Sequence, residues 1–250
     1  MGEGQHILFG KNAVREAFTA GRRFEKILVQ VGFDKEELLY YKEKQAAPEI
    51  KMLPKERLEL VLRKALGNRP FIHQGIVAFV AQVEIYRLED VIDQIYSRGE
   101  SPFLLVLDGI TDVRNLGAIA RTACSFAMHA LVVPMRNNAP LSPEAIKSSA
   151  GALNRITVCK ESSIEVIIKL LHAHGIRMVA ADSQQGKPLS DISWAGPLAL
   201  VMGSEDEGVS AVTRKFAPDR VKIDTAETFE SLNVSVAAGI ILHHAYHARK

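Results

Sequence analysis

The chain from Phe103 onward alternates short apolar runs with segments of helical periodicity. The runs are continuous rather than alternating, which is typical of strands in a parallel sheet covered on both faces. This pattern predicts an α/β domain of about 150 residues with a mainly parallel, doubly wound sheet. We expect its strands at 103–107, 131–134, 156–159, 177–181, 198–202 and 220–223. We expect its helices at 119–126, 142–153, 164–174 and 232–247.

The front part of the chain predicts a second, smaller α/β unit. Its expected helices are 12–18, 36–46 and 55–63, and its expected strands are 26–30, 50–53 and 74–80. A charged segment with an amphipathic stripe follows, and Ser101-Pro102 marks a boundary. The expected domains are therefore a small unit at 1–82, a linker helix within 83–101 and the larger domain at 102–250.

The composition limits the class of protein. Of the 250 residues, 47% are hydrophobic and 24% are charged, which is ordinary for a globular protein and excludes disordered and fibrous chains. Cys124 and Cys159 are too few for a disulfide framework or a four-cysteine zinc site, which favours a reducing compartment. No apolar run approaches the ~20 residues of a membrane span, and the polar start is unlike a signal peptide. We expect a cytoplasmic protein without a membrane partner.

The charge is distributed unevenly, although the net charge is only +2. Residues 1–82 hold 14 Lys and Arg against 10 Asp and Glu, while the remainder holds 17 against 19. The basic excess suggests that the front unit contacts a polyanion, although an ordinary solvated surface explains it equally well. The candidate residues for this polyanion contact are Arg57, Arg63, Lys64 and Arg69.

Polar residues follow expected strands or open an expected helix at 107–117, 202–208 and 231–235. In open α/β sheets, ligands bind beyond the carboxyl ends of the strands, so these segments predict a ligand site. The chain has no G-x-G-x-x-G string, and Gly208 is followed by Val209 rather than by the lysine of a phosphate loop. Three acidic residues at 205–207 would repel a phosphate. The loop therefore favours a neutral or cationic ligand.

Together the three segments resemble the signature motifs of the SpoU (TrmH-like) RNA 2′-O-ribose methyltransferases, a family of the α/β-knot superfamily. The matching positions are Asn115, Gly117 and Arg121, then Gly203, Glu205 and Gly208, then the string Ser-Leu-Asn-Val-Ser at 231–235. The chain departs at Val113, where many members have proline. The front unit is similar to the ribosomal-protein-like RNA-binding domain of large-subunit rRNA guanosine methyltransferases of the RlmB type.

The resemblance implies a deep trefoil knot in the larger domain, an exception to the rule that chains do not thread their own loops. It implies S-adenosyl-L-methionine as the cofactor in the knot cleft, bound at positions that match Met202, Gly203, Ile223, Ser231 and Leu232. It also implies a homodimer through the knot domain with the last helix in the interface. Ordinary core packing explains the apolar residues of that helix equally well.

The reaction implied by the resemblance is methylation of the ribose 2′-hydroxyl of a guanosine in 23S rRNA. A tRNA guanosine methyltransferase of the same family and a non-catalytic RNA-binding assembly factor are alternatives. Arg121 would contact the hydroxyl or a phosphate, Asn115, Ser231 and Asn233 would orient the ribose, and Glu205 would anchor the Asn115 loop or accept from Arg121. Helix caps, a solvated loop acid and a surface arginine are their structural alternatives.

The last helix also carries His243 and His247 at the spacing of a metal-ligand pair. No cluster of further potential metal ligands accompanies this pair in the sequence. We expect no metal site.

Overall fold

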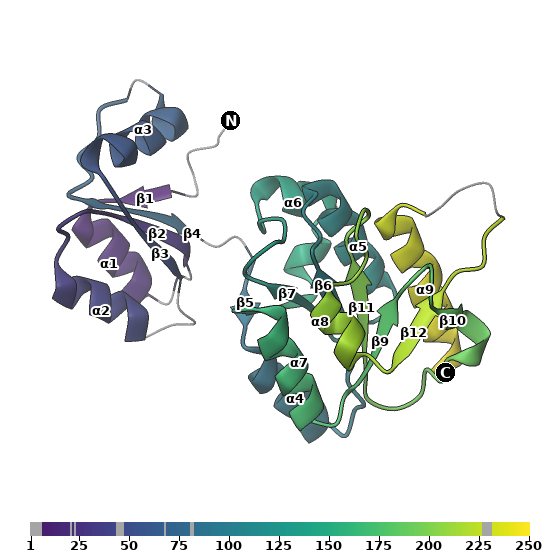
Figure 1. Ribbon diagram of the computed structural model, residues 1–250. Coiled ribbons are helices and arrows are strands. Elements are labelled where there is room, and N and C mark those ends of the chain that lie inside the picture. Colours follow the sequence, from purple (N-terminus) through teal and green to yellow (C-terminus); the bar gives the residue numbers. More distant parts are fainter. Residues whose placement is uncertain are drawn as a thin grey trace. The chain divides into compact units, whose positions relative to one another are not determined.

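The computed structural model describes residues 7–20, 22, 24–43, 48–67, 69–80, 83–226 and 232–250. The chain forms two compact units, and the boundary between them falls after Glu84. Figure 1 shows both units with their helices and strands labelled.

The first unit is a four-stranded sheet with helices on both faces, in the strand order β1-β4-β2-β3. Strand β4 is antiparallel to β1 and β2, whereas β2 and β3 are parallel. Its elements are β1 (Ile7–Phe9), α1 (Lys11–Thr19), β2 (Phe24–Gln30), α2 (Lys35–Glu43), β3 (Glu49–Leu53), α3 (Lys55–Leu66) and β4 (Ile76–Val80). Alternate residues of β2 face opposite cores: Ile27 and Val29 pack with α1 and α2, and Leu28 packs with α3.

The second unit contains an eight-stranded sheet in the order β10-β12-β9-β11-β6-β7-β8-β5, and its described strand pairs are parallel. The strands are β5 (Ile85–Tyr86), β6 (Phe103–Asp108), β7 (Ala130–Pro134), β8 (Thr157–Glu161), β9 (Arg177–Ala181), β10 (Lys187–Pro188), β11 (Leu198–Gly203) and β12 (Asp219–Lys222). The helices are α4 (Leu88–Ser97), α5 (Val113–Ser125), α6 (Pro143–Ser148), α7 (Ile164–Ala173), α8 (Ala211–Phe216) and α9 (Val234–Ala248).

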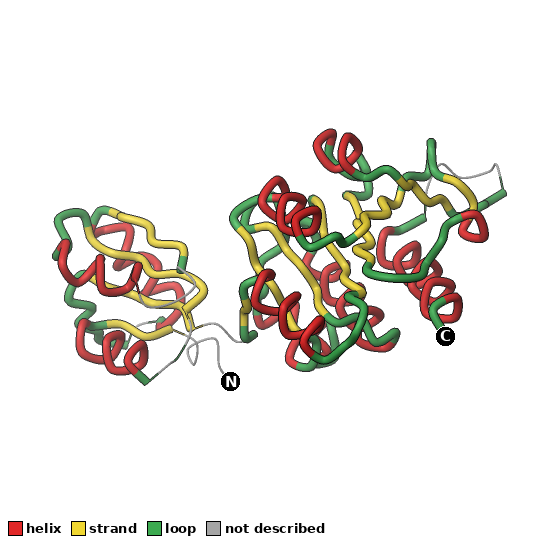
Figure 2. The backbone as a smooth tube through the Cα atoms, turned by 90° about the horizontal axis from the view of Figure 1, so that it is seen from below, coloured by secondary structure: helices red, strands yellow, loops and turns green. Residues whose placement is uncertain are grey.

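The strands of this unit lie between two layers of helices (Figure 2). One buried apolar cluster joins the sheet to α4 and α7, with Ala217 just after α8. Helix α5 contacts both α6 and α9 on the other face. The central strands β6 and β11 are buried along their whole length, as their continuous apolar runs predict.

The fold class predicted from the sequence is confirmed, and each of the nine expected strands overlaps an observed one. Several details differ. The expected helix at 142–153 ends at Ser148, because Ala150 and Gly151 adopt positive φ angles of 51° and 82°. Helix α8 and the short strands β1, β5 and β10 were not expected. The knot remains a prediction, since the connection from β12 to α9 includes 227–231, which lie outside the described residues.

The segment predicted as a linker, 83–101, holds β5 and α4 and forms part of the second unit. Leu88, Ile92 and Ile95 are buried in its core, and Ile85 pairs in parallel with Val158 of β8. The amphipathic stripe is therefore a core-facing helix surface. The expected helix is present, but it covers the sheet instead of joining the domains.

Candidate functional site

A cavity of about 490 Å³ lies where β9, β11 and β12 end and α9 begins. This is the carboxyl edge of the parallel sheet, where open α/β sheets bind their ligands. Met202, Gly203, Ile223 and Leu232 line the cavity, so the structure brings together these residues, all of them expected to bind the cofactor. Ser231 lies outside the described residues.

The shape of the loop after β11 requires glycine at position 203. A Cβ atom on Gly203 would overlap the Gly208 carbonyl carbon and the Val209 nitrogen. The loop closes through two backbone hydrogen bonds between Ser204 and Gly208, of 3.0 and 3.1 Å. This tight closure leaves the acidic residues of its tip exposed, with Glu205 turned toward the start of α9.

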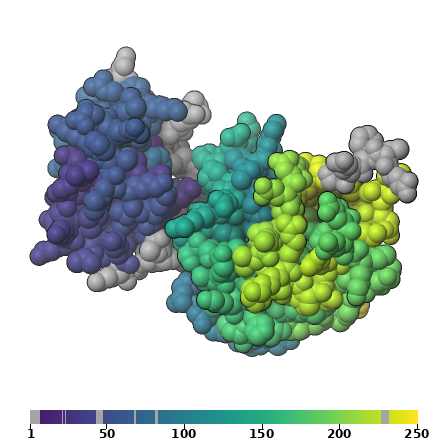
Figure 3. All heavy atoms as spheres, in the orientation of Figure 1, coloured from purple at the N-terminus to yellow at the C-terminus, as the bar shows by residue number. Residues whose placement is uncertain are grey.

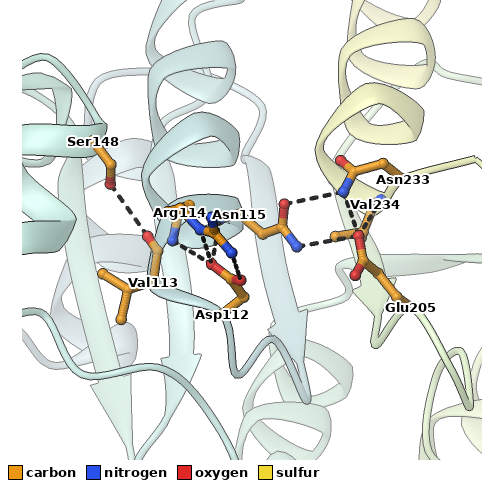
Figure 4. A network of polar contacts seen from close by, with 8 residues as sticks. All are labelled: Asp112, Val113, Arg114, Asn115, Ser148, Glu205, Asn233 and Val234. Atoms are coloured by element: carbon orange, nitrogen blue, oxygen red, sulfur yellow. Dashed lines mark hydrogen bonds and ion pairs between the residues drawn. The ribbon is translucent and has the colours of Figure 1, made fainter.

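Three polar side chains from distant parts of the chain meet beside this loop (Figure 4). Asn115 Nδ2 donates to Glu205 Oε1 at 3.2 Å, and Asn233 Nδ2 lies 3.2 Å from Asn115 Oδ1 and also donates to Glu205 Oε1. The Val234 backbone nitrogen lies 3.4 Å from the same carboxylate oxygen. Each residue comes from a different one of the three sequence motifs, so the structure joins the motifs at one place.

Helix caps hold two members of this network in position. Asp112 caps α5 by accepting hydrogen bonds from the backbone nitrogens of Arg114 and Asn115, at 2.6 and 3.4 Å. The Arg114 side chain, hydrogen-bonded to this carboxylate, lowers the pKa of Asp112. Asn233 caps α9 through its Oδ1, which accepts from Ser235 N at 2.9 Å, while its Nδ2 serves the network. The cap and the site role of Asn233 are therefore compatible.

The glycine of the first motif has a packing role. A Cβ atom on Gly117 would lie 2.8 Å from both Ser148 Cβ and Ser149 N. Helices α5 and α6 therefore touch at this residue, and Ser148 Oγ donates to the Val113 carbonyl at 3.2 Å (Figure 4). The contact fixes the first turn of α5, which carries Asn115.

Arg121 is exposed on α5, and its side chain has no hydrogen-bond or ion-pair partner among the residues that the structure describes. Six helical positions separate it from Asn115, about 120° around the helix axis. The structure therefore does not bring Arg121 into the network. Of the two roles expected for Glu205, the described contacts correspond to anchoring the Asn115 loop.

Sequence reasoning gave no role to Asp108, the last residue of β6. Its carboxylate is buried and accepts hydrogen bonds from Ser210 N at 2.8 Å and Thr213 Oγ1 at 2.6 Å. It pairs in register with Gly203 of β11. Asp108 thus ties the far end of the acidic loop to the sheet edge. An acid directly after a buried apolar run is the signal that could have identified it.

The candidate RNA-binding residues belong to the first unit. Arg57, Arg63 and Lys64 lie on the exposed side of α3, and Arg69 follows the helix. None of the four forms an ion pair with another described residue. Leu60, between them on the helix, is 66% exposed. This surface is available to an external partner of negative charge.

Within the described ranges, no group of three or more His, Cys, Asp and Glu side chains could hold a metal ion. The rings of His243 and His247 lie 4.6 Å apart on α9 without a third such neighbour among these residues. No described helix has the length and apolar character needed to cross a bilayer.

A solved RNA 2′-O ribose methyltransferase has the same fold, with a TM-score of 0.55 and 24% identity over 97% of this chain and 88% of its own. Residues 102–243 match the SpoU rRNA methylase family, and residues 7–86 match the RNA 2′-O ribose methyltransferase substrate-binding domain. The chain belongs to the SpoU rRNA methylase family.

Curated relatives resemble the chain over nearly its whole length. The 23S rRNA (guanosine-2′-O-)-methyltransferase RlmB of Escherichia coli is 33% identical over 97% of this chain and 98% of its own. A putative TrmH family tRNA/rRNA methyltransferase of Bacillus subtilis is 30% identical over 100% of this chain and 98% of its own. The SpoU methyltransferase AviRb of Streptomyces viridochromogenes, solved with the cofactor AdoMet, has the same fold, with a TM-score of 0.60 and 22% identity over 96% of this chain and 89% of its own.

Proposed function

We propose that this protein transfers a methyl group from S-adenosylmethionine to the ribose 2′-hydroxyl of a guanosine in large-subunit (23S) rRNA. The proposal rests above all on the network of Asn115, Glu205 and Asn233, which joins three motifs beside the cavity. Ser231 and Arg121 complete the proposed catalytic set by their places in the same motifs.

The cavity suits this methyl donor. Ile223, Leu232 and Ile241 give it apolar walls for an adenine ring, and the Gly203 backbone comes close to it. The acidic loop at 205–207 suits the positive charge of the donor. S-adenosylmethionine supplies a methyl group bonded to a cationic sulfur, which makes that methyl reactive toward an oxygen nucleophile.

The contacts of Glu205 and Arg121 assign a different role to each of these side chains. The Glu205 carboxylate accepts from two side-chain amides through Oε1 and lies near the Val234 nitrogen, and in this role it holds Asn115 and Asn233 in place. The Arg121 guanidinium has no partner among the described residues and is free to bind a phosphate of the substrate RNA in two-pronged geometry. The positive charge of Arg121 at that phosphate would stabilise negative charge on the reacting nucleotide.

The first unit would recruit the RNA through the basic side of α3. Replacing Arg63 and Lys64 together with alanine should lower the salt dependence of RNA binding by up to ~0.7 in log–log slope for each lost single-strand phosphate contact. An unchanged slope would assign RNA binding to another surface. The relatives in Escherichia coli and Bacillus subtilis carry rRNA and mixed tRNA/rRNA names, so a tRNA guanosine is the second candidate substrate.

We further propose that the protein is a cytoplasmic homodimer that pairs through α9. Val236 and Ile240 lie one turn apart on this helix and are 51% and 38% exposed, so together they form an apolar strip on its outer surface. Burial against a second copy would remove this surface from water. Sedimentation equilibrium should give a dimer for the native protein and a monomer for the Val236→Glu, Ile240→Glu double variant.

One experiment tests the proposed activity. Purified protein, S-adenosylmethionine with a labelled methyl group and unmodified total bacterial RNA are incubated together, and the labelled nucleotide is mapped by mass spectrometry. Label on the 2′-oxygen of a guanosine in 23S rRNA is the expected result. Label in tRNA supports the second substrate, and binding of RNA without any label supports a non-catalytic assembly factor.

A further inference from the structure

Arg214 is a cation on the wall of the cavity that no negative group of the described chain neutralises. It comes from α8 and is exposed, and its side chain has no hydrogen-bond or ion-pair partner among the described residues. The other basic residue of the wall, Lys222, lies 3.7 Å from Asp224. The acid Asp182 on the same wall pairs with Arg220 at 3.6 Å. Arg214 is thus the cavity cation available to a ligand within the described chain.

The fold holds the backbone of Arg214 firmly while leaving its guanidinium free. Ser210 caps α8 by accepting from Thr213 N at 3.2 Å, and Thr213 Oγ1 donates to the buried Asp108 at 2.6 Å. The Arg220 side chain donates to the Arg214 carbonyl at 3.3 Å. The lime-coloured segment that includes α8 forms part of the exposed surface in Figure 3. Because the turn itself is anchored, binding a ligand would order only the Arg214 side chain and not its backbone.

We propose that Arg214 binds the carboxylate of the methyl donor, a step that rests on the proposed function. S-adenosylmethionine has two positive groups, the sulfonium and the ammonium, and one negative group, the carboxylate. The acidic tip of the loop after β11 suits the positive groups, whereas Arg214 is the cavity residue that suits the negative one. A guanidinium matches a carboxylate with two parallel hydrogen bonds.

The test compares two ligands that differ only in this carboxylate. Isothermal titration measures the affinity of the full-length protein for S-adenosylmethionine and for decarboxylated S-adenosylmethionine. Arg214→Gln should weaken binding of the intact donor by roughly 10-fold or more, as for loss of a charged hydrogen bond. The same variant should leave the affinity for the decarboxylated donor within about twofold. Arg214→Lys should keep part of the preference for the intact donor, because it retains the charge.

Lys215→Gln is the matched control. This lysine is the next residue of α8, does not line the cavity and lies over the Phe216 ring at 5.6 Å. It should change neither affinity.

Each other result has a separate meaning. Equal weakening of both ligands by Arg214→Gln would overturn the inference, because a structural effect on the cavity does not distinguish the two molecules. Unchanged affinity of Arg214→Gln for the intact donor would also overturn the inference. Weaker RNA binding by the same variant would then assign Arg214 to a phosphate contact. A native protein that binds neither ligand would refute the proposed function itself, and the inference with it.

Discussion

Asn233 and Asn115 lie with the amide nitrogen of one 3.2 Å from the amide oxygen of the other, although 118 residues separate them in the chain. Asn115 accepts with its oxygen and donates to Glu205 with its nitrogen. Asn233 uses its oxygen as a helix cap and its nitrogen in the network. Both ends of each amide therefore have a partner, so neither residue can be replaced by an isosteric acid without losing a donor.

Asn233→Ala should weaken binding of the methyl donor and slow methylation together. It removes a hydrogen bond worth roughly 0.5–1.5 kcal/mol, and more where the partner is the charged Glu205. Titration calorimetry and an initial-rate assay measure the two effects. Asn154→Ala, at an exposed position outside the cavity wall, is the control. A lower melting temperature with full activity and affinity would mean that Asn233 serves only as a cap.

Two helical glycines should respond in opposite ways to alanine. Gly117→Ala should destabilise the protein by about 1–3 kcal/mol, because its Cβ would lie 2.8 Å from Ser149 N. Gly239→Ala meets nothing nearer than Thr122 Cγ2 at 4.0 Å and should be neutral or stabilising by up to about 1 kcal/mol. Urea unfolding measures both. A tolerated Gly117→Ala would contradict the close approach of α5 and α6.

The contrast between these glycines shows which features of the structure the sequence alone does not predict. Continuous apolar runs such as 103–107 predict buried strands because burial of both sheet faces dictates their composition. Spacing also predicts that Asn115, Glu205 and Asn233 lie at one sheet edge. It does not encode that Gly117 touches Ser148, because that depends on how two helices cross. The amphipathic stripe of α4 likewise predicts a helix without saying what the helix covers.

Asp108→Asn should loosen the loop that carries Glu205. The carboxylate accepts two hydrogen bonds in a buried place, and an amide there loses the charge and gains a donor, at a cost of roughly 1–3 kcal/mol. Urea unfolding should detect the loss, and titration calorimetry should detect weaker donor binding. Asp191→Asn, an exposed position, is the control. A variant with the same free energy of unfolding and the same donor affinity as the native protein would contradict the role of Asp108.

The two thiols should differ in reactivity. Burial raises the pKa of Cys159 to about 12, whereas Cys124 is partly exposed. A thiol reagent at pH 8 should modify Cys124 in the native protein and Cys159 only after unfolding, since the thiolate is the reactive form.

The raised pKa of Cys159 also makes the stability depend on pH, because the same thiol ionises near pH 8.5 in the unfolded chain. Unfolding therefore releases a proton above that pH, and the free energy of unfolding should fall as the pH rises from about 9 toward 12. Cys159→Ala should remove that part of the slope, and equal labelling of both thiols would contradict the burial.

Arg121 gives the most direct test of the chemistry. Its exposed guanidinium has no partner in the described chain, so its removal should leave the fold and the donor affinity unchanged. If it stabilises charge on the reacting nucleotide only during transfer, its loss appears in turnover rather than in binding. Arg121→Ala should therefore slow methylation by at least ~10²-fold. Arg121→Lys keeps the charge but loses the planar fork, and it should remain far below the native rate. Arg98→Ala, on a residue outside the cavity wall, should change nothing in the assay. Near-normal turnover in the lysine variant would reduce Arg121 to a point charge, and near-normal turnover in the alanine variant would remove it from the mechanism.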